Sequence, residues 1–209
     1  MLKVGLAKGR ISEDARMMLI HLGFDVSEMD QSRKLIFENS DASIHLVLLK
    51  AADIPLFVQD GSLDLGILGK DSVLESGMDD CEIYRLSFSK CRLCIAGPKE
   101  RVLLNNGIRV ATKYPEITKQ IMKKRNIDAT IIQLSGSLEL APLIKLSDVI
   151  VDLVQSGQTL RENDLEVYET LMDISATVIA NCKSRRTKKI EIALFLGVCA
   201  KLEVLSEAI

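Results

Sequence analysis

The chain has 209 residues, of which 47% are hydrophobic and 27% are charged, so it can bury a substantial core, which argues against intrinsic disorder. Its 27 Lys and Arg residues against 29 Asp and Glu residues give a net charge of -2, which excludes the general phosphate attraction of a nucleic-acid-binding protein. Any site for a polyanion must therefore be local.

The sequence does not predict a signal peptide or a membrane span. The N-terminus, MLKVGLAKGR, lacks a long apolar region, and the longest uninterrupted apolar stretch, Ile192 to Ala200, is far short of the ~20 residues that cross a bilayer. The five cysteines form no disulfide framework for a chain of this size, and their odd number favours a reducing compartment. We therefore expect a soluble cytoplasmic protein.

Short β-rich runs alternate with helical patterns along most of the chain, which predicts βα units and a largely parallel sheet. In the first half the runs are KVGLA, SIHLVLL and LDLGILG, with helices expected near residues 12–22 and 53–59. Ser12 offers an acceptor at the start of the first helix, and Gly23 is placed to end it. Residues 24–37 are expected to hold a short hairpin.

A second cycle of the same kind begins after GPKE. Its runs are IRVAT, ATIIQL and DVIVDLV, and its helices are expected over residues 115–125, where Pro115 fits the first turn, and near residues 138–146. Residues 92–99 are interpreted as a crossing between two lobes. The last segment, residues 188–205, predicts a helix that is apolar over most of its circumference and packs on the first lobe or on a partner subunit.

The whole pattern predicts an α/β protein with two lobes, each a mainly parallel sheet flanked by helices. We assign residues 1–91 and 181–209 to the first lobe and residues 92–180 to the second. Ligands of open α/β sheets bind at the carboxyl ends of the strands, so functional residues are expected just after strands, around a ligand cleft between the lobes.

The segment DVIVDLVQSGQTL, residues 148–160, predicts a buried strand that ends in a turn before a helix. Backbone N–H groups and the helix dipole at such a turn can hold a phosphate, with Ser156 and Thr159 as further donors. Asp152, just upstream, is placed to accept hydrogen bonds from sugar hydroxyls. The alternative is an ordinary strand-to-helix turn in which the two hydroxyls only cap the helix.

Two further segments place charge after expected strands. Glu139 follows ATIIQL in the first turn of the next helix, where it acts either as a ligand or only as a complement to the helix dipole. Lys8, Gly9 and Arg10 follow the first strand and suit an approaching anion, although a solvated basic turn is the alternative interpretation.

Cys91 and Cys94 form a CxxC, a pattern found in redox pairs and in zinc sites. They lie within an expected strand, not at a helix N-terminus, and no second CxxC or histidine pair completes four metal ligands. We therefore interpret them as buried or semi-buried thiols. His21 and His45 lack metal-ligand spacing and are assigned to packing.

Five segments resemble, in order and over nearly the whole chain, the successive motifs of the ATP phosphoribosyltransferase family. They are LAKGR at 6–10, ADIPLFVQDGSLDLGILGKD at 52–71, SKCRL at 89–93, RVATKYP at 109–115 and ELAPLIKLSDVIVDLVQSGQTL at 139–160. The resemblance implies a two-domain fold like that of type II periplasmic binding proteins. It also implies a Mg²⁺-dependent attack of adenine N1 of ATP on C1 of phosphoribosyl pyrophosphate (PRPP), the first step of histidine biosynthesis.

With this resemblance we assign roles to the residues that follow strands. The 5′-phosphate of PRPP is assigned to Ser156, Gly157, Gln158 and Thr159, and its ribose or metal-linked hydroxyls are assigned to Glu139 and Asp152. The catalytic cations are expected to be Lys8, Arg33 and Lys50, and the ATP contacts Lys8, Gly9, Arg10 and Asp71. No protein ligand set for a metal is expected, because Mg²⁺ would be bound through substrate phosphates.

The sequence departs from the family pattern at two places. Lys50 stands where many relatives carry Arg, and QSGQT at 155–159 replaces the commoner Ser-Thr-Gly-x-Thr. The first change keeps the positive charge, and the second keeps the glycine and the final threonine.

The resemblance also implies a short-form member, which ends before the C-terminal regulatory domain of long-form members. Such members work with a second subunit similar to histidyl-tRNA synthetase, which supplies feedback inhibition by histidine. The chain is therefore expected to form a homo-oligomer within a hetero-oligomer, with no nucleic-acid or membrane partner.

Two other functional classes fit parts of the sequence. A non-catalytic ligand-binding module with the same two-lobed fold would explain the anion-binding turn but would release no pyrophosphate. An assembly or regulatory protein would use the apolar C-terminal helix and the charged run Lys183 to Lys189, although such runs are usually solvated and no DNA-binding motif accompanies this one. Pyrophosphate release from ATP plus PRPP distinguishes the enzyme from both.

Overall fold

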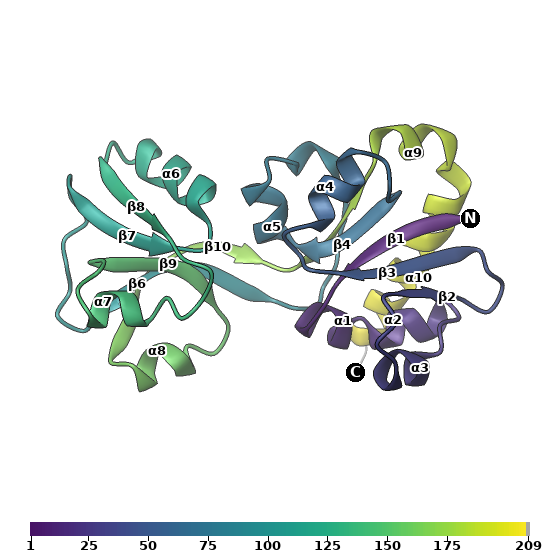
Figure 1. The fold of residues 1–209 in the computed structure, drawn as a ribbon, viewed down its shortest axis with the longest axis horizontal. Coiled ribbons are helices and arrows are strands. Elements are labelled where there is room, and N and C mark those ends of the chain that lie inside the picture. The colour runs from purple at the N-terminus through teal and green to yellow at the C-terminus, as the bar shows by residue number, and fades with distance from the viewer. Residues whose placement is uncertain (208–209) are drawn as a thin grey trace. The chain divides into compact units, whose positions relative to one another are not determined.

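The computed structural model describes residues 1–207, which form two compact α/β units (Figure 1). The first unit joins Met1–Ser89 to the chain from Ser175 onward, and the second is Lys90–Ile174.

These unit boundaries, 89/90 and 174/175, differ from the predicted 91/92 and 180/181. Strand β11 (Ala176–Ala180) pairs with β4 (Leu65–Gly69) of the first sheet, and residues 92–99, expected to cross between lobes, belong largely to β6 (Cys91–Pro98), an inner strand of the second sheet.

The first unit contains a six-stranded mixed sheet with the strand order β2-β3-β1-β4-β11-β5. Its other strands are β1 (Leu2–Ala7), β2 (Ile36–Glu38), β3 (Ile44–Leu49) and β5 (Glu82–Arg85). Its helices are α1 (Arg10–Asp14), α2 (Arg16–His21), α3 (Val26–Gln31), α4 (Ile54–Gln59), α5 (Lys70–Glu75), α9 (Cys182–Thr187) and α10 (Lys189–Glu207), with a 3-10 turn η1 (Asp79–Cys81). The predicted parallel pairing holds for β3, β1 and β4, whereas β2, β11 and β5 run antiparallel to their neighbours.

The second unit contains a five-stranded mixed sheet with the order β10-β6-β9-β7-β8. Its other strands are β7 (Ile108–Thr112), β8 (Ala129–Gln133), β9 (Val149–Val154) and β10 (Leu165–Ile174), and its helices are α6 (Pro115–Lys124), α7 (Leu140–Leu143) and α8 (Gln158–Glu162). Strands β8, β7 and β9 are parallel, while β6 and β10 are antiparallel. Figure 1 shows α6 on one face of this sheet and α7 and α8 on the other.

Apolar layers cover both faces of the first sheet. On one face α2 and α10 pack together and bury Leu19 and Phe195 against the strands, and on the other face α4 and α5 bury Ile54 and Val73. Each such side chain contributes about 1.5–3 kcal/mol of burial. The return of the last helix to the first unit is as predicted. Within the part of the chain that the structure describes, no helix has both the length and the apolar character that a bilayer span needs.

Two local elements differ from their predictions because of turn and capping chemistry. The helix expected over 12–22 is split into α1 and α2 at Ala15, and it begins after Gly9, while Ser12 Oγ donates back to the carbonyl oxygen of Gly9 over 2.7 Å. The hairpin expected over 24–37 is wrong. Asp25 accepts hydrogen bonds from the N–H groups of Ser27 and Glu28, so it caps α3, and only the short strand β2 follows.

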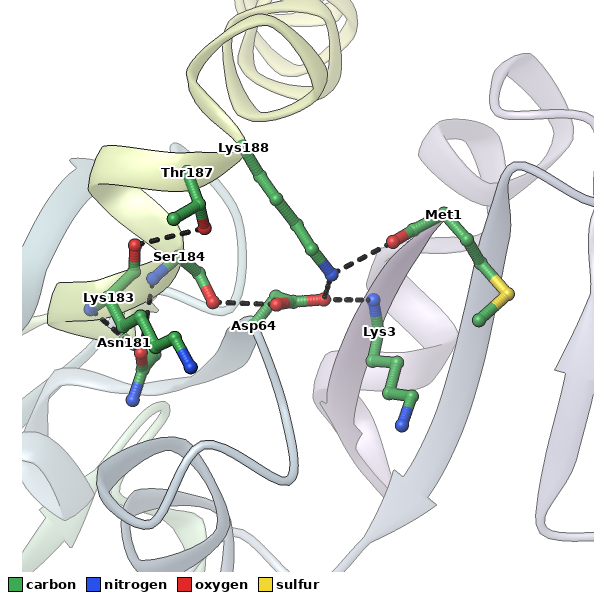
Figure 2. Close-up of polar contacts among 8 residues, drawn as sticks. All are labelled: Met1, Lys3, Asp64, Asn181, Lys183, Ser184, Thr187 and Lys188. Atoms are coloured by element: carbon green, nitrogen blue, oxygen red, sulfur yellow. Dashed lines mark hydrogen bonds and ion pairs between the residues drawn. The ribbon is translucent and has the colours of Figure 1, made fainter.

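Asp64 fastens the returning chain to the first strand (Figure 2). This carboxylate is 6% exposed, and its Oδ2 accepts from the backbone N–H of Lys3 at 2.8 Å and from Lys188 Nζ at 2.6 Å. Its Oδ1 accepts from Ser184 Oγ at 2.6 Å, and Lys188 Nζ also donates to the carbonyl oxygen of Met1 at 2.9 Å. The Asp64 network therefore joins β1 to both α9 and the start of α10.

The Asp64 network predicts a pH-dependent part of the stability. Burial on its own raises the pKa of Asp64, but hydrogen bonds from Lys188, Ser184 and the Lys3 backbone outweigh it, so the pKa lies below its ordinary value. A lowered folded-state pKa stabilises the protein above the ordinary carboxyl pKa, and this stabilisation is lost as the pH falls through the folded-state pKa. We expect Asp64→Asn to lower the free energy of unfolding at neutral pH by about 2 kcal/mol, because charged hydrogen bonds are lost at a buried position.

Urea unfolding at several pH values measures this effect. The difference between the parent and Asp64→Asn should be largest near neutral pH and should shrink in acid. Asp79→Asn is the matched control, because Asp79 is exposed at the start of η1 and should change the free energy of unfolding by no more than about 0.5 kcal/mol. A difference between parent and Asp64→Asn that stays constant down to strongly acidic pH would contradict the assignment.

Candidate functional site

In the second unit β9 ends in the turn QSG, and α8 follows directly. Gly157 is the N-cap residue of α8, with φ 71° and ψ 13°, a left-handed conformation that glycine adopts without the steric cost of a side chain. The N–H of Gln158 donates to Ser156 Oγ at 3.3 Å. Ser156 and Thr159 are both exposed. The turn therefore presents backbone N–H groups and two hydroxyls at the start of a helix, the arrangement that binds phosphate.

The four residues assigned to the 5′-phosphate do not contribute in the same way. Among residues 1–207, Thr159 makes no side-chain hydrogen bond, so its hydroxyl is available to a ligand. The side-chain amide of Gln158 instead donates to Glu162 Oε1 at 2.7 Å, along α8. Gln158 can thus serve the turn through its backbone N–H, while Thr159 can serve it through its hydroxyl.

Arg161 is a residue of this turn that the sequence analysis missed. Its Nη1 donates to the carbonyl oxygen of Ser156 at 2.9 Å, and a Cβ at Gly157 would lie 3.3 Å from that nitrogen. A guanidinium therefore lies over the turn and adds a positive charge beside it. The signal was present in the sequence, because Arg161 follows Gly157 by four residues, the spacing that places two residues on one face of a helix.

The carboxylates assigned to PRPP lie at the same edge of the second sheet. Because β8, β7 and β9 are parallel, with Thr112 opposite both Gln133 and Val151, their carboxyl ends share this edge. Asp152 lies near the end of β9, is half-buried, and accepts from the N–H of Leu153 at 2.8 Å. Glu139, also half-buried, follows β8 and directly precedes α7, so it is one residue outside the helix whose first turn it was expected to occupy.

Arg92 is a second residue that the sequence analysis left without a role. It is exposed, and it pairs with Val154 in the antiparallel register of β6 and β9. An antiparallel strand begins at the edge where its parallel neighbours end, so Arg92 lies one residue from the start of the turn. The direction of β6 could not be read from the sequence alone, although Arg92 belongs to the SKCRL motif.

In the first unit the three expected catalytic cations also share one edge. Ala7 of β1 pairs with Leu49 of β3, so Lys8 and Lys50 both follow directly at the carboxyl ends of adjacent parallel strands. The register of antiparallel β2 continues beyond its start, with Leu48 N–H donating to Leu35 O at 2.8 Å, so Arg33 precedes β2 at this same edge. Lys8, Arg33 and Lys50 are all exposed, and together they form a local positive field in a chain of net charge -2.

The other residues assigned to ATP, Gly9, Arg10 and Asp71, differ from one another in their surroundings and in their exposure. Gly9 has φ 90° and ψ -142° and precedes α1, a backbone that requires glycine. Arg10 donates from Nη2 to the carbonyl oxygen of Ser89 at 3.3 Å, so its guanidinium helps to hold the chain where the first unit ends. Asp71 is only 7% exposed, and its Oδ1 would clash with a Cβ at Gly69, so its carboxylate folds over the end of β4.

Cys91 and Cys94 are both buried in β6. The Cys94 thiol lies 3.8 Å from the carbonyl oxygen of Arg92 and 3.7 Å from Thr170 Oγ1. Among the described residues, no group of three or more His, Cys, Asp and Glu side chains is arranged to hold a metal ion. The burial of both thiols within a strand agrees with their interpretation as buried thiols.

The double substitution Cys91→Ser with Cys94→Ser is expected to leave kcat and KM within about threefold of the parent. Folding should suffer modestly, because a buried hydroxyl without a full set of partners costs about 1–3 kcal/mol. Steady-state kinetics and zinc analysis of the purified protein measure the outcome. Stoichiometric zinc in the parent, or lost turnover in a double variant that remains folded, would overturn this assignment.

The fold and these strand-end residues define a class, the two-unit α/β proteins with the type II periplasmic-binding-protein fold. The chain is similar in structure to the alkanesulfonate-binding protein SsuA from Xanthomonas axonopodis pv. citri, with a TM-score of 0.58 and 12% sequence identity over 96% of this chain and 72% of that one. At this identity the likeness shows the fold alone.

The family model of ATP phosphoribosyltransferase matches residues 50–198. The chain is 44% identical over 211 residues to an ATP phosphoribosyltransferase of Lachnoclostridium phytofermentans, covering 98% of this chain and 97% of the relative. A similar relative in Oceanobacillus iheyensis is 43% identical over 192 residues, covering 90% of this chain and 92% of the relative. The chain belongs to the ATP phosphoribosyltransferase family, which confirms the resemblance found in its motifs.

A solved structure in this family agrees with the fold. The "ATP phosphoribosyl transferase (HisG:HisZ) complex from Thermotoga maritima" contains a chain that superposes with a TM-score of 0.84 at 32% sequence identity. The match covers 96% of this chain and 98% of that chain, so both α/β units are included.

Proposed function

We propose that this chain is the catalytic subunit of an ATP phosphoribosyltransferase, which condenses ATP with PRPP to give N1-(5-phosphoribosyl)-ATP and pyrophosphate, the first step of histidine biosynthesis. The family assignment supports the activity. The single structural observation that carries the proposal is the turn between β9 and α8, with Gly157 in a left-handed conformation and the Thr159 hydroxyl exposed.

The 5′-phosphate of PRPP is proposed to bind at this turn. A phosphate dianion would accept from the backbone N–H groups around Gly157 and from the hydroxyls of Ser156 and Thr159, each worth about 1.5–3 kcal/mol as a hydrogen bond to a charged group. Arg161 lies over the turn and Arg92 lies beside it, which supports an anion at this place.

The ribose of PRPP is proposed to contact Asp152 and Glu139. Both carboxylates lie at the edge of the second sheet where the phosphate turn begins, and both are half-buried. Ionised carboxylates only accept hydrogen bonds, so they suit the hydroxyl groups of a sugar.

The phosphates of ATP and the departing pyrophosphate are proposed to bind at the edge of the first sheet. Lys8, Arg33 and Lys50 supply positive charge there, and Gly9 allows the backbone to approach closely. Lys50 acts as a compact point charge, whereas an arginine at this position could bind a phosphate with two parallel hydrogen bonds. Arg10 and Asp71 are proposed to support this edge, since one holds the carbonyl of Ser89 and the other folds over Gly69.

The reaction depends on positioning of the two substrates and on stabilisation of the leaving pyrophosphate, and it requires no activated nucleophile from the protein. The bond from C1 of the ribose to the pyrophosphate oxygen breaks with its electron pair on the leaving pyrophosphate, and the neutral N1 of adenine supplies the pair for the new N1–C1 bond. Positive charge from the lysines and arginines stabilises the negative charge that develops on the leaving group. Positioning of the two substrates lowers the activation barrier further, so no serine or cysteine needs to form a covalent intermediate.

Magnesium is proposed as the cofactor. The ion is proposed to be held through the substrate phosphates, with the half-buried carboxylates of Asp152 and Glu139 beside it, accepting from ribose or metal-linked hydroxyls. When bound, Mg²⁺ neutralises phosphate charge. We place the reaction in the cytoplasm, because five free thiols suit a reducing compartment.

A second subunit similar to histidyl-tRNA synthetase is proposed as the partner. The solved relative from Thermotoga maritima is a complex of two kinds of subunit, HisG and HisZ. Helix α10 buries Phe195 but leaves Ile190 and Leu194 exposed at 75% and 69% of their surface. This apolar strip is a candidate surface for docking of the partner or for self-association within the hetero-oligomer.

The decisive assay measures pyrophosphate release from ATP plus PRPP, together with the mass of the nucleotide product, with and without the partner subunit. We expect one pyrophosphate for each ATP joined to a phosphoribosyl group. Binding of both substrates without pyrophosphate release, even with the partner present, would favour a non-catalytic ligand-binding module instead.

A further inference from the structure

The thiols of Cys81 and Cys182 meet at one end of the first sheet. Strand β5 starts directly after Cys81, and it pairs antiparallel with β11, with Glu82 opposite Ile179. Cys81 therefore lies beside the end of β11, and Cys182 follows that end as the first residue of α9. The Cys182 thiol is close enough to raise the pKa of the Cys81 thiol.

A second contact holds the same two segments together. Arg185 of α9 donates from Nη1 to the carbonyl oxygen of Asp80 in η1, at a long distance of 3.5 Å. Asn181 caps α9 by accepting from the N–H groups of Lys183 and Ser184, which fixes the helix start that carries Cys182. The approach of the two thiols thus follows from strand register and helix capping.

The two thiols differ in their access to solvent. Cys182 is exposed and Cys81 is half-buried, whereas the other three cysteines are buried. Burial raises the pKa of the Cys81 thiol, the nearby Cys182 raises it further, and Arg185 opposes both effects. Cys182 is therefore the thiol that a solute can reach first. Within the described residues no third His, Cys, Asp or Glu joins the pair to form a metal-binding group.

We propose that Cys81 and Cys182 are a modification site, a dithiol that forms a reversible disulfide by exchange with a low-molecular-weight disulfide. The Cys182 thiolate attacks one sulfur of the small disulfide, and one small thiolate leaves with the electron pair of the broken S–S bond. Cys81 then loses its proton to solvent and attacks the Cys182 sulfur of the mixed disulfide, which releases the second small thiolate. In total two protein thiols are oxidised and one small disulfide is reduced to two thiols.

The position of this bond gives it a structural consequence. Cys81 and Cys182 lie on either side of the whole second unit in the sequence, so the disulfide would close a loop of about 100 residues. Helix α9 also carries Ser184, which the Asp64 network holds to the first strand. Oxidation would add a covalent tether to a segment that Asn181, Ser184 and Arg185 hold to the rest of the unit by hydrogen bonds.

The test treats the reduced, folded full-length chain with oxidised glutathione, blocks the remaining thiols with iodoacetamide, and determines intact mass and digested peptides. We expect the loss of two of the five thiols, a mass about 2 Da lower before alkylation, and a linked peptide pair containing Cys81 and Cys182, all reversed by dithiothreitol. Cys81→Ser should stop at the mixed disulfide of Cys182 with glutathione, about 305 Da heavier, because no second thiol resolves it.

Cys199→Ser is the matched control, because Cys199 is buried against Met18 and should not take part, so this variant should still form the linked peptide pair. Cys182→Ser removes an exposed side chain, which should leave the fold intact, and it should abolish the linked pair. A stable glutathione adduct in the parent, a disulfide-linked dimer, a Cys91–Cys94 pair, or five unreacted thiols would each overturn the proposal.

Discussion

Thr159→Ala should weaken PRPP binding about 10- to 150-fold while leaving ATP binding nearly unchanged. The threonine hydroxyl is exposed in the first turn of α8 and has no side-chain hydrogen bond within residues 1–207. Its removal therefore takes a donor from the 5′-phosphate without breaking a contact of the fold. A hydrogen bond to a charged group is worth about 1.5–3 kcal/mol, which gives this range of affinities. Isothermal calorimetry with each substrate measures the two dissociation constants.

Two further variants separate this role from a general effect on the second unit. Thr159→Ser keeps the hydroxyl and should bind PRPP with nearly the parent affinity. Thr130→Ala removes an exposed threonine from β8 in the same unit, in the strand rather than at its end, and should change neither affinity. Equal PRPP affinity in Thr159→Ala and the parent would contradict the assignment of the turn, and an equal loss for ATP would indicate a general disturbance.

The sequence predicted the central strands of each sheet because their apolar runs are long and are separated by helical patterns. The elements that it missed depend on one capping residue or on distant pairing. Asp25 makes residues 26–31 a helix where a hairpin was expected. The run ATVIAN has the composition of a buried strand in either sheet, and only its pairing with β4 assigns it to the first unit.

The candidate site could be predicted where its residues directly follow a strand. Lys8, Lys50 and the turn before Thr159 are of this kind, since the end of a buried strand is visible in the sequence. Arg92 was missed because its position depends on the direction of β6, and Arg161 was missed because its side chain reaches back from α8 to the carbonyl oxygen of Ser156.

Side-chain partners could not be predicted at all. The sequence does not indicate that Gln158 bonds to Glu162, that Arg10 reaches Ser89, or that Asp71 is buried over Gly69. Each of these contacts depends on rotamers and backbone angles that are fixed only by the folded surroundings. The meeting of Cys81 with Cys182 has the same origin, since it requires the pairing of β5 with β11.

Histidine at saturating concentration should leave the rate of the isolated chain unchanged and should inhibit the complex reconstituted with the synthetase-like subunit. Residues 1–207 form two units, and both carry residues proposed for the substrates, so the described part of the chain has no third unit to bind a regulator. Inhibition by histidine is therefore expected to act through contact between subunits. An effector can change the rate only if it binds better to one state of the complex than to the other.

The coupling needed for this inhibition is modest. A tenfold drop in rate corresponds to about 1.4 kcal/mol of preference for the inactive state, within the usual range of allosteric coupling. Initial rates of pyrophosphate release, measured for the chain alone and for the complex with L-histidine or D-histidine, determine whether the effect is specific and where it acts. Inhibition of the isolated chain by L-histidine, non-competitive with both substrates, would show a regulatory site within this chain and would contradict the assignment of both units to the substrates.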